Sequence, residues 1–142
     1  MKLELGVEDV AYSDPDAKGV TTTGEVAEIL EAKYHVMRVF AELHGQDMAD
    51  AITNDLANSM DALLNGEKIS KVPLQSAMNQ IESDFRDYLS ADEWQKTTGQ
   101  AIAAAQNGVS HRFKKVSGKK RGPRPAFIDT GLFSASFRAK VS

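Results

Sequence analysis

The sequence of 142 residues contains no cysteine and is poor in aromatic residues, which make up 7% of it. The lack of cysteine excludes disulfide frameworks, cysteine-ligated metal sites and thiol chemistry, and it fits a reducing compartment. No apolar run approaches the roughly 18 residues of a membrane-spanning helix, and the first residues lack the apolar core of a signal peptide. We therefore expect a soluble protein that is made in the cytoplasm and does not associate with membranes.

Charge is distributed unevenly along the chain. Residues 1–110 carry 19 acidic and 8 basic residues, a net charge of −11, whereas residues 111–142 carry 9 basic residues and 1 acidic residue, a net charge of +8. A basic tail on an acidic body indicates a polyanionic partner or an acidic protein surface as the target of the tail. The tail could also fold back onto its own acidic body, because composition does not locate charges in space.

The hydrophobic pattern predicts one α+β domain over residues 1–142 that is mainly α. Apolar residues alternate with polar residues or glycine from Leu3 to Val7 and with polar residues from Phe137 to Val141, which predicts short strands at the two ends that could pair with each other. Because two short strands alone are marginal in water, helix packing or partner contacts must support them. Between the strands, apolar spacings of three, four and seven residues predict a body of three to five helices.

Capping signals place the expected helix ends. Thr23 is the expected N-cap of a helix over residues 24–44, and Gly45 either separates it from a helix over residues 48–64 or weakens one long helix. Asn65-Gly66 is a helix stop signal. Pro73 suits the first turn of a third helix, and the capping box Ser90-Ala91-Asp92-Glu93 predicts a fourth that runs through residues 101–105.

Apolar residues at helical spacing are expected to form the core. They comprise Val26, Ile29, Leu30, Met37, Phe40 and Leu43, then Met48, Ile52, Leu56, Met60, Leu63 and Leu64, then Met78, Phe85 and Trp94. Exposure of some of them would instead indicate an oligomer interface.

Motifs for catalysis or metal binding are weak. Asp14, Asp16, Gly19 and Glu25 have the spacing of a calcium loop, but Lys18 occupies a ligand position and a strand precedes it, so a turn and a helix cap are the expectation. The histidines at positions 35, 44 and 111 lack metal-ligand spacing. Acidic pairs on helices have no accompanying nucleophile, and no phosphate-binding glycine loop is present. We therefore expect a non-enzymatic protein without metal or cofactor.

The tail differs in character from the preceding strand and helical body, which span residues 1–112. Residues 113–125, the basic segment, combine glycine and proline with six cations and are predicted to form a mobile loop: Lys114, Lys115, Lys119, Lys120, Arg121 and Arg124. Residues 126–142 are expected to form a turn at Asp129-Thr130-Gly131 and then the terminal strand.

Within the tail, residues 122–137, with the order basic-Pro, an apolar pair, Asp129-Thr130-Gly131, Leu132 and then Ser136, resemble a segment of tailed-bacteriophage virion morphogenesis proteins, namely the tail-completion and neck families. In those families a helical body accompanies a small sheet, and Thr-Gly starts a turn before a strand. The resemblance implies a structural protein made in the host bacterial cytoplasm that forms a homo-oligomeric ring in the virion and joins head and tail parts.

The expected partner-binding residues follow from combining the tail with this resemblance. The basic segment would become ordered on a partner surface, and residues 130–133 would orient the terminal strand for pairing with a neighbouring chain. The assigned residues are the six cations together with Phe127, Thr130, Gly131, Leu132 and Phe133. The alternative is a nucleic-acid-binding or packaging accessory protein whose cations contact phosphates. No aromatic residue is interleaved with those cations, and the pI of about 5.6 is low for such a protein.

Overall fold

The structure is a computed structural model that describes residues 1–11, 22–69, 74–91, 93–98 and 132–142. In chain order the elements are β1 (Leu3–Val7), α1 (Thr23–Tyr34), α2 (Val36–Leu64), α3 (Gln75–Ser90), α4 (Glu93–Thr98), α6 (Leu132–Ser136) and β2 (Phe137–Val141). The described part is mainly helical with two short terminal strands. The α+β, mainly α class predicted from the sequence is therefore confirmed.

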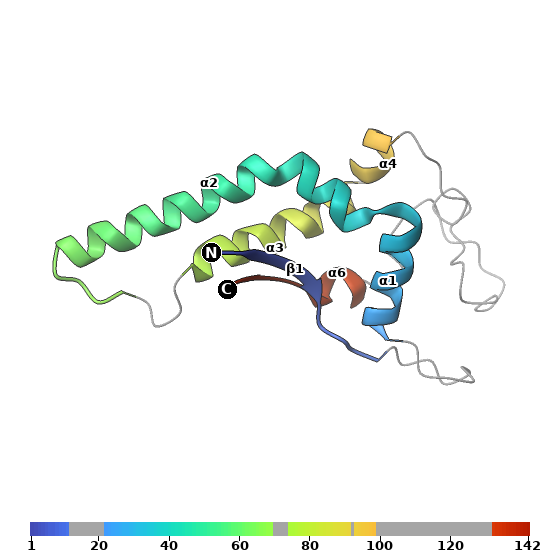
Figure 1. The fold of residues 1–142 in the computed structure, drawn as a ribbon, viewed down its shortest axis with the longest axis horizontal. Coiled ribbons are helices and arrows are strands. Elements are labelled where there is room, and N and C mark those ends of the chain that lie inside the picture. The colour runs from blue at the N-terminus through green and yellow to red at the C-terminus, as the bar shows by residue number, and fades with distance from the viewer. Residues whose placement is uncertain (12–21, 70–73, 92, 99–131) are drawn as a thin grey trace.

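Two long helices form the body of the molecule. Helices α2 and α3 run side by side in opposite directions, and the C-terminal end of α2 extends past the start of α3 (Figure 1). Strand β2 packs against α3, and β1 lies on the other side of β2. Both chain ends therefore lie together beside α3 (Figure 1).

The two strands form an antiparallel sheet in which Leu3 lies opposite Val141 and Val7 lies opposite Phe137. This pairing was expected from the sequence and is confirmed. The apolar residues of both strands face the helices, where Phe137 is fully buried and Ala139 is nearly so. Helix packing thus supplies the support that a two-stranded sheet needs.

Aromatic side chains hold the sheet against the helices. The rings of Phe85 on α3 and Phe137 on β2 stack with centroids 3.8 Å apart, and Phe40 on α2 meets Phe85 edge-on at 5.1 Å. The buried indole of Trp94 also has a hydrogen-bond partner, because its Nε1 donates to the Tyr34 carbonyl at 3.0 Å. The aromatic pairs contribute stability beyond that of the apolar area they bury, so this cluster helps to fix the sheet on the helices.

The start of α1 differs by one residue from the prediction. Thr22, instead of Thr23, is the N-cap and forms a capping box with Glu25. Thr23 is fully buried; its hydroxyl donates to the Glu8 carbonyl and accepts from the Val10 amide at 2.8 Å. Thr23 therefore ties the chain after β1 to the start of α1.

The break between the first two helices lies at His35, whereas the sequence indicated either a break at Gly45 or one long helix weakened there. His35 has left-handed backbone angles (φ 52°, ψ 43°), and the Glu31 carboxylate accepts from the Met37 amide at 2.8 Å and the Arg38 amide at 3.2 Å. These bonds satisfy two of the backbone amides that have no partner within the first turn of a helix, so α2 can begin directly after α1. Gly45 lies inside α2, because Phe40 and Met48 on either side of it are buried.

The end of α2 at Leu64 follows the prediction, with Gly66 at a positive φ of 75°. Pro73 lies outside the described residues. Helix α3 starts at Gln75, and its Ala77 amide donates to Asp55 Oδ2 of α2 at 2.9 Å. A side chain of one long helix thus caps the other.

The predicted core is confirmed for only part of the apolar series. Phe40, Met48, Met78, Phe85 and Trp94 are buried, and Met37 is partly buried. The prediction is wrong for Ile29 and Leu43 and for the far end of α2, where these side chains are exposed: Leu56, Met60, Leu63 and Leu64. Ile52 is partly buried against the core and Asp55 still contacts α3, but from Leu56 on α2 extends past the start of α3, so α3 does not cover these side chains.

The C-terminal region also departs from the prediction. The terminal strand begins at Phe137 as predicted, but Leu132–Ser136 before it form the short helix α6, which was not predicted from the sequence. Ser136 Oγ donates to the Leu132 carbonyl at 2.7 Å, the contact with the residue four positions earlier that a serine side chain can make in a helical turn. A fourth helix carrying Trp94 is present, but α4 begins at Glu93, and Ser90, the predicted N-cap, is instead the last residue of α3. The expected continuation of α4, the basic segment and the Asp129-Thr130-Gly131 turn lie outside the described residues.

Candidate functional site

Only two of the residues assigned to partner binding from the sequence are described. Leu132 is half-buried, and Phe133 is 5% exposed and packs edge-on against Phe85 with centroids 6.3 Å apart. In this conformation Phe133 serves the core of its own chain. The others lie outside the described residues: Lys114, Lys115, Lys119, Lys120, Arg121, Arg124, Phe127, Thr130 and Gly131.

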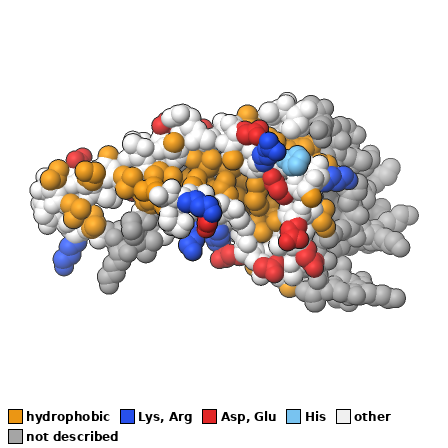
Figure 2. All heavy atoms as spheres, viewed as in Figure 1, with side chains coloured by type: hydrophobic (Ala, Val, Ile, Leu, Met, Phe, Trp, Pro, Cys, Tyr) orange, Lys and Arg blue, Asp and Glu red, His pale blue; other side chains and the backbone are white. Residues whose placement is uncertain are grey.

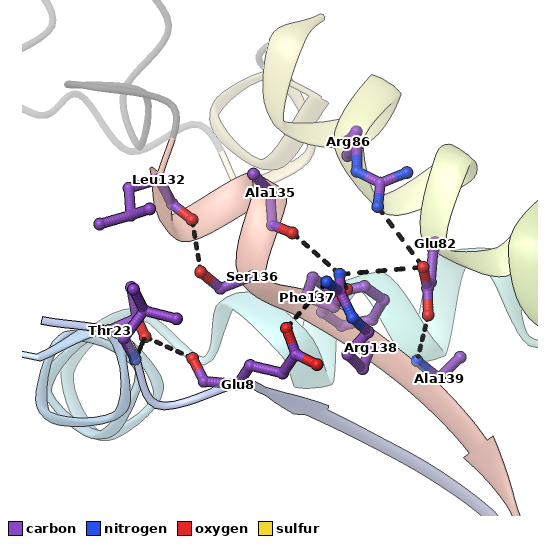
Figure 3. A network of polar contacts seen from close by, with 11 residues as sticks. Glu8, Thr23, Glu82, Arg86, Leu132, Ala135, Ser136, Phe137, Arg138 and Ala139 are labelled. Carbon is purple, nitrogen blue, oxygen red and sulfur yellow. Dashed lines mark hydrogen bonds and ion pairs between the residues drawn. The ribbon is translucent and has the colours of Figure 1, made fainter.

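Arg138, at the start of β2, joins three elements (Figure 3). Its guanidinium donates to the Ala135 carbonyl of α6 at 2.9 Å and to the Glu8 carboxylate beyond β1 at 2.8 Å. It also lies 4.0 Å from Glu82 Oε2 on α3. Since arginine carries several donors in a fixed plane, one side chain here sets the position of the sheet relative to α6 and α3.

The outer edge of β2 is partly covered. The backbone bonds between Lys2 and Ser142 run both ways at 2.8 and 2.9 Å, so the amide of every second residue, including Ala139, points away from β1. The Ala139 amide donates to Glu82 Oε1 at 3.2 Å, and Arg86 holds the same carboxylate at 3.4 Å (Figure 3). Glu82 thus satisfies a donor that would otherwise be free to pair with another strand.

The outer edge of β1 is open. By the same alternation, the amide and carbonyl groups of Leu3, Leu5 and Val7 point away from β2. Within the described part of the chain these outward groups have no hydrogen-bond partner. An exposed row of this kind is a template for a further strand. We call Leu3, Leu5 and Val7 the β1 edge.

The surroundings of the β1 edge favour a specific partner. The three side chains are half-buried over the core, so an added strand would extend an apolar face that already exists. On the opposite face, Lys2 pairs with Glu4 at 2.9 Å, which lowers the pKa of the Glu4 carboxyl. A Cβ at Gly6 would meet no atom within 4 Å, so the outer face is uncrowded there. Charges next to the edge restrict unspecific pairing.

A second surface is an acidic hollow between α2, α3 and α4. Its lining carries His44 together with the carboxylates of Asp47, Asp50, Asp84, Asp87 and Glu93, and no described lysine or arginine. His44 stacks on Phe40 at 4.9 Å, with its ring nitrogens 3.4 Å from Asp47 and 3.1 Å from Glu93. The contact with Glu93 is a hydrogen bond, and together with the stacking on Phe40 it holds the ring in place. The hollow complements a cationic segment in charge.

Two further features concern metal ions and membranes, and both apply to the described residues alone. No group of three or more metal-ligating side chains in those ranges is placed to hold a metal ion. Glu25, the last residue of the calcium-like spacing, is engaged in the capping box of α1. No described helix has the length and apolar character needed to cross a membrane.

Comparisons with protein-family models, curated proteins and solved structures found no match to this chain. The sequence predicted strand pairing with a neighbouring chain but not which edge of the sheet is open. The edge of β2 is covered by Glu82, which reaches it only because α3 packs against β2. No local signal marks that role, although the spacing of Glu82 and Arg86 on a helix is typical of an ion pair.

Proposed function

We propose that this protein is a non-enzymatic structural component of a tailed-phage virion, a neck or tail-completion protein that assembles into a homo-oligomeric ring and joins head and tail parts. The observation that supports this most directly is the β1 edge, an unpaired strand edge in the small sheet that β1 forms with β2, and β2 begins at the last residue of the segment that resembles those families. A strand from a neighbouring protein would pair there through main-chain bonds.

Charge supports the same proposal. The basic segment carries six cations, and the described body offers the acidic hollow. In a ring, the basic segment of one copy would lie against the hollow of the next, and every copy would make the same head-to-tail contact. Such complementarity guides assembly and fixes register more than it adds affinity.

Proline at position 5 tests the edge. The Leu5 amide points away from β2, so Leu5→Pro removes an outward donor and leaves the pairing within the chain intact. Leu5→Ala is the matched control, because it shortens the same side chain but keeps the amide. Both variants should show the helical circular dichroism of the parent.

In the phage that encodes this protein, we expect Leu5→Ala to give joined particles, while Leu5→Pro leaves unjoined heads and tails that electron microscopy would reveal. Normal particles from Leu5→Pro would overturn the assembly role of the β1 edge. Absence of the parent protein from purified particles would overturn the virion proposal as a whole.

A further inference from the structure

The backbone of the β1 edge limits how another strand can pair with it. Main-chain bonds form only where outward groups of one strand face outward groups of the other. On β1 these groups belong to every second residue, namely Leu3, Leu5 and Val7. If the added strand is an antiparallel copy of β1, a register centred on Leu5 pairs all three of these residues. A shift by two residues in either direction pairs only two of them.

Charge selects the same register. On the exposed face of β1, Lys2, Glu4, Gly6 and Glu8 follow one another at every second position. The register centred on Leu5 sets Lys2 opposite Glu8 of the second copy, and Glu4 opposite its Gly6. A shift by two residues sets Glu4 opposite another glutamate, either Glu4 or Glu8 of the second copy, and like charges directly opposite each other are destabilising. The strand is therefore complementary to itself in one register.

The exposed face has room for these contacts. The side chains of Lys2 and Glu8 are 73% and 57% exposed, and Figure 2 shows basic and acidic side chains next to each other where the strands lie in Figure 1. Glu8 accepts from Arg138 at 2.8 Å, and a carboxylate has further lone pairs for a lysine of a second copy. No atom lies within 4 Å of a Cβ built at Gly6, so the space that Glu4 of the second copy would need is open.

We propose that the β1 edge pairs antiparallel with the β1 edge of a second copy, about a two-fold axis at Leu5, so that two sheets join into one sheet of four strands. The inference rests on the proposed function in that it names the partner of the same edge. A two-fold contact closes on itself and gives a pair. The head-to-tail contact of the proposed ring uses the acidic hollow between α2, α3 and α4, so the two contacts do not compete.

Charge reversal tests the register. Lys2→Glu sets like charges at both ends of the pair, because the two-fold axis repeats each contact, and Glu8→Lys does the same with the opposite sign. Each variant alone should dimerise about tenfold more weakly than the parent. An equal mixture of the two should form a mixed dimer with about the parent's affinity, because unlike charges again face each other at both ends. Lys96→Glu, at an exposed residue of α4, is the matched control and should dimerise like the parent.

Cysteine cross-linking is a second measurement that keeps both end charges, because the chain contains no cysteine of its own. In the proposed register, Glu4 and Gly6 of the second copy form a pair without main-chain bonds, with Cα atoms about 4.5 Å apart, which a disulfide can bridge. A mixture of Glu4→Cys and Gly6→Cys chains should therefore give more mixed disulfide dimer than like dimers. Lys96→Cys chains should stay monomeric under the same oxidation.

Sedimentation equilibrium over a concentration series measures the affinity. Two strands of five residues make a small contact, so the dimer should be populated only at high protein concentration. A monomeric parent at the highest soluble concentration, or equal yields of mixed and like disulfide dimers, would overturn the pairing.

The outcomes separate this inference from the proposed function. If Leu5→Pro leaves heads and tails unjoined while the charge-reversed chains form no mixed dimer, the edge takes a strand of another protein. That result overturns the pairing of two copies and leaves the virion proposal standing. If the mixed dimer forms but purified particles lack the protein, the pairing stands and the virion proposal fails.

Discussion

Tyr88 shows how a single residue connects the core to pH. Its ring is 1% exposed, and its hydroxyl donates to the Val36 carbonyl at 3.1 Å. Burial raises the pKa of the phenol well above its ordinary value, and the negative charges of Glu93 and Glu31 act in the same direction. The folded protein therefore keeps this proton at pH values where an unfolded tyrosine releases it.

Tyr88→Phe should lower the free energy of unfolding by about 1 kcal/mol near neutral pH, because the buried hydrogen bond is lost. Above the unfolded tyrosine pKa of about 10, the free energy of unfolding of the parent should fall by up to about 1.4 kcal/mol per pH unit, because only its unfolded state releases this proton. The variant has no such proton and should not show this fall. The difference between the two proteins should thus shrink and then reverse. Urea titrations from pH 7 to 11 measure this, and a constant difference over that range would contradict it.

The role of Glu82 in covering the outer edge of β2 could not be predicted from the sequence. Its side chain is 15% exposed and serves Ala139, Arg86 and Arg138 at once. In the sequence it is one of many acids on an amphipathic helix, a pattern that normally indicates a solvated face. Only the docking of β2 on α3 brings these partners together.

Among the elements, α2 is long enough to test helix propensity directly. Gly45 lies in its interior, and a Cβ there would meet no atom within 4 Å. Gly45→Ala should therefore raise the free energy of unfolding by about 0.5–1 kcal/mol. Gly66→Ala is the matched control: its φ of 75° strains any residue with a Cβ, so it should lower stability by about 1 kcal/mol. Thermal unfolding compares the two, and stabilisation by both would contradict the assignment of Gly66.

The terminal strands and the end of α2 were predictable because their signals are local: alternation for the strands and Asn65-Gly66 for the helix. The break at His35 was not, since it depends on a Glu31 carboxylate that reaches the next helix and not on glycine or proline. Periodicity likewise identified the apolar face of α2 but not how much of it α3 covers. The exposure of Leu56, Met60, Leu63 and Leu64 therefore could not be predicted from the sequence.

For the whole molecule, neutralising the six cations of the basic segment tests which of the two proposed functions, virion assembly or DNA binding, depends on them. Replacing Lys114, Lys115, Lys119, Lys120, Arg121 and Arg124 with glutamine removes six positive charges. If the protein bound DNA through these residues, a plot of the logarithm of the parent's binding constant against the logarithm of salt concentration would have a slope of about −5. The assembly proposal predicts instead that the variant binds DNA no less well than the parent but joins particles poorly.

Fluorescence anisotropy with duplex DNA at several salt concentrations, together with particle counts, measures both effects. A steep salt slope in the parent that disappears in the variant, with normal particle yield, would favour the packaging alternative over the neck proposal.

The pairing of the two terminal strands also has a consequence for the order of folding. The ion pair between Glu8 and Arg138 joins residues 130 positions apart, and the strand pairs beside it span similar separations. Contacts of such long range form slowly, because nearly the whole chain must close as a loop before they form. During translation β1 is made about 130 residues before its partner strand. It stays unpaired on both edges until then, so the sheet completes only after α2 and α3 have had time to pack.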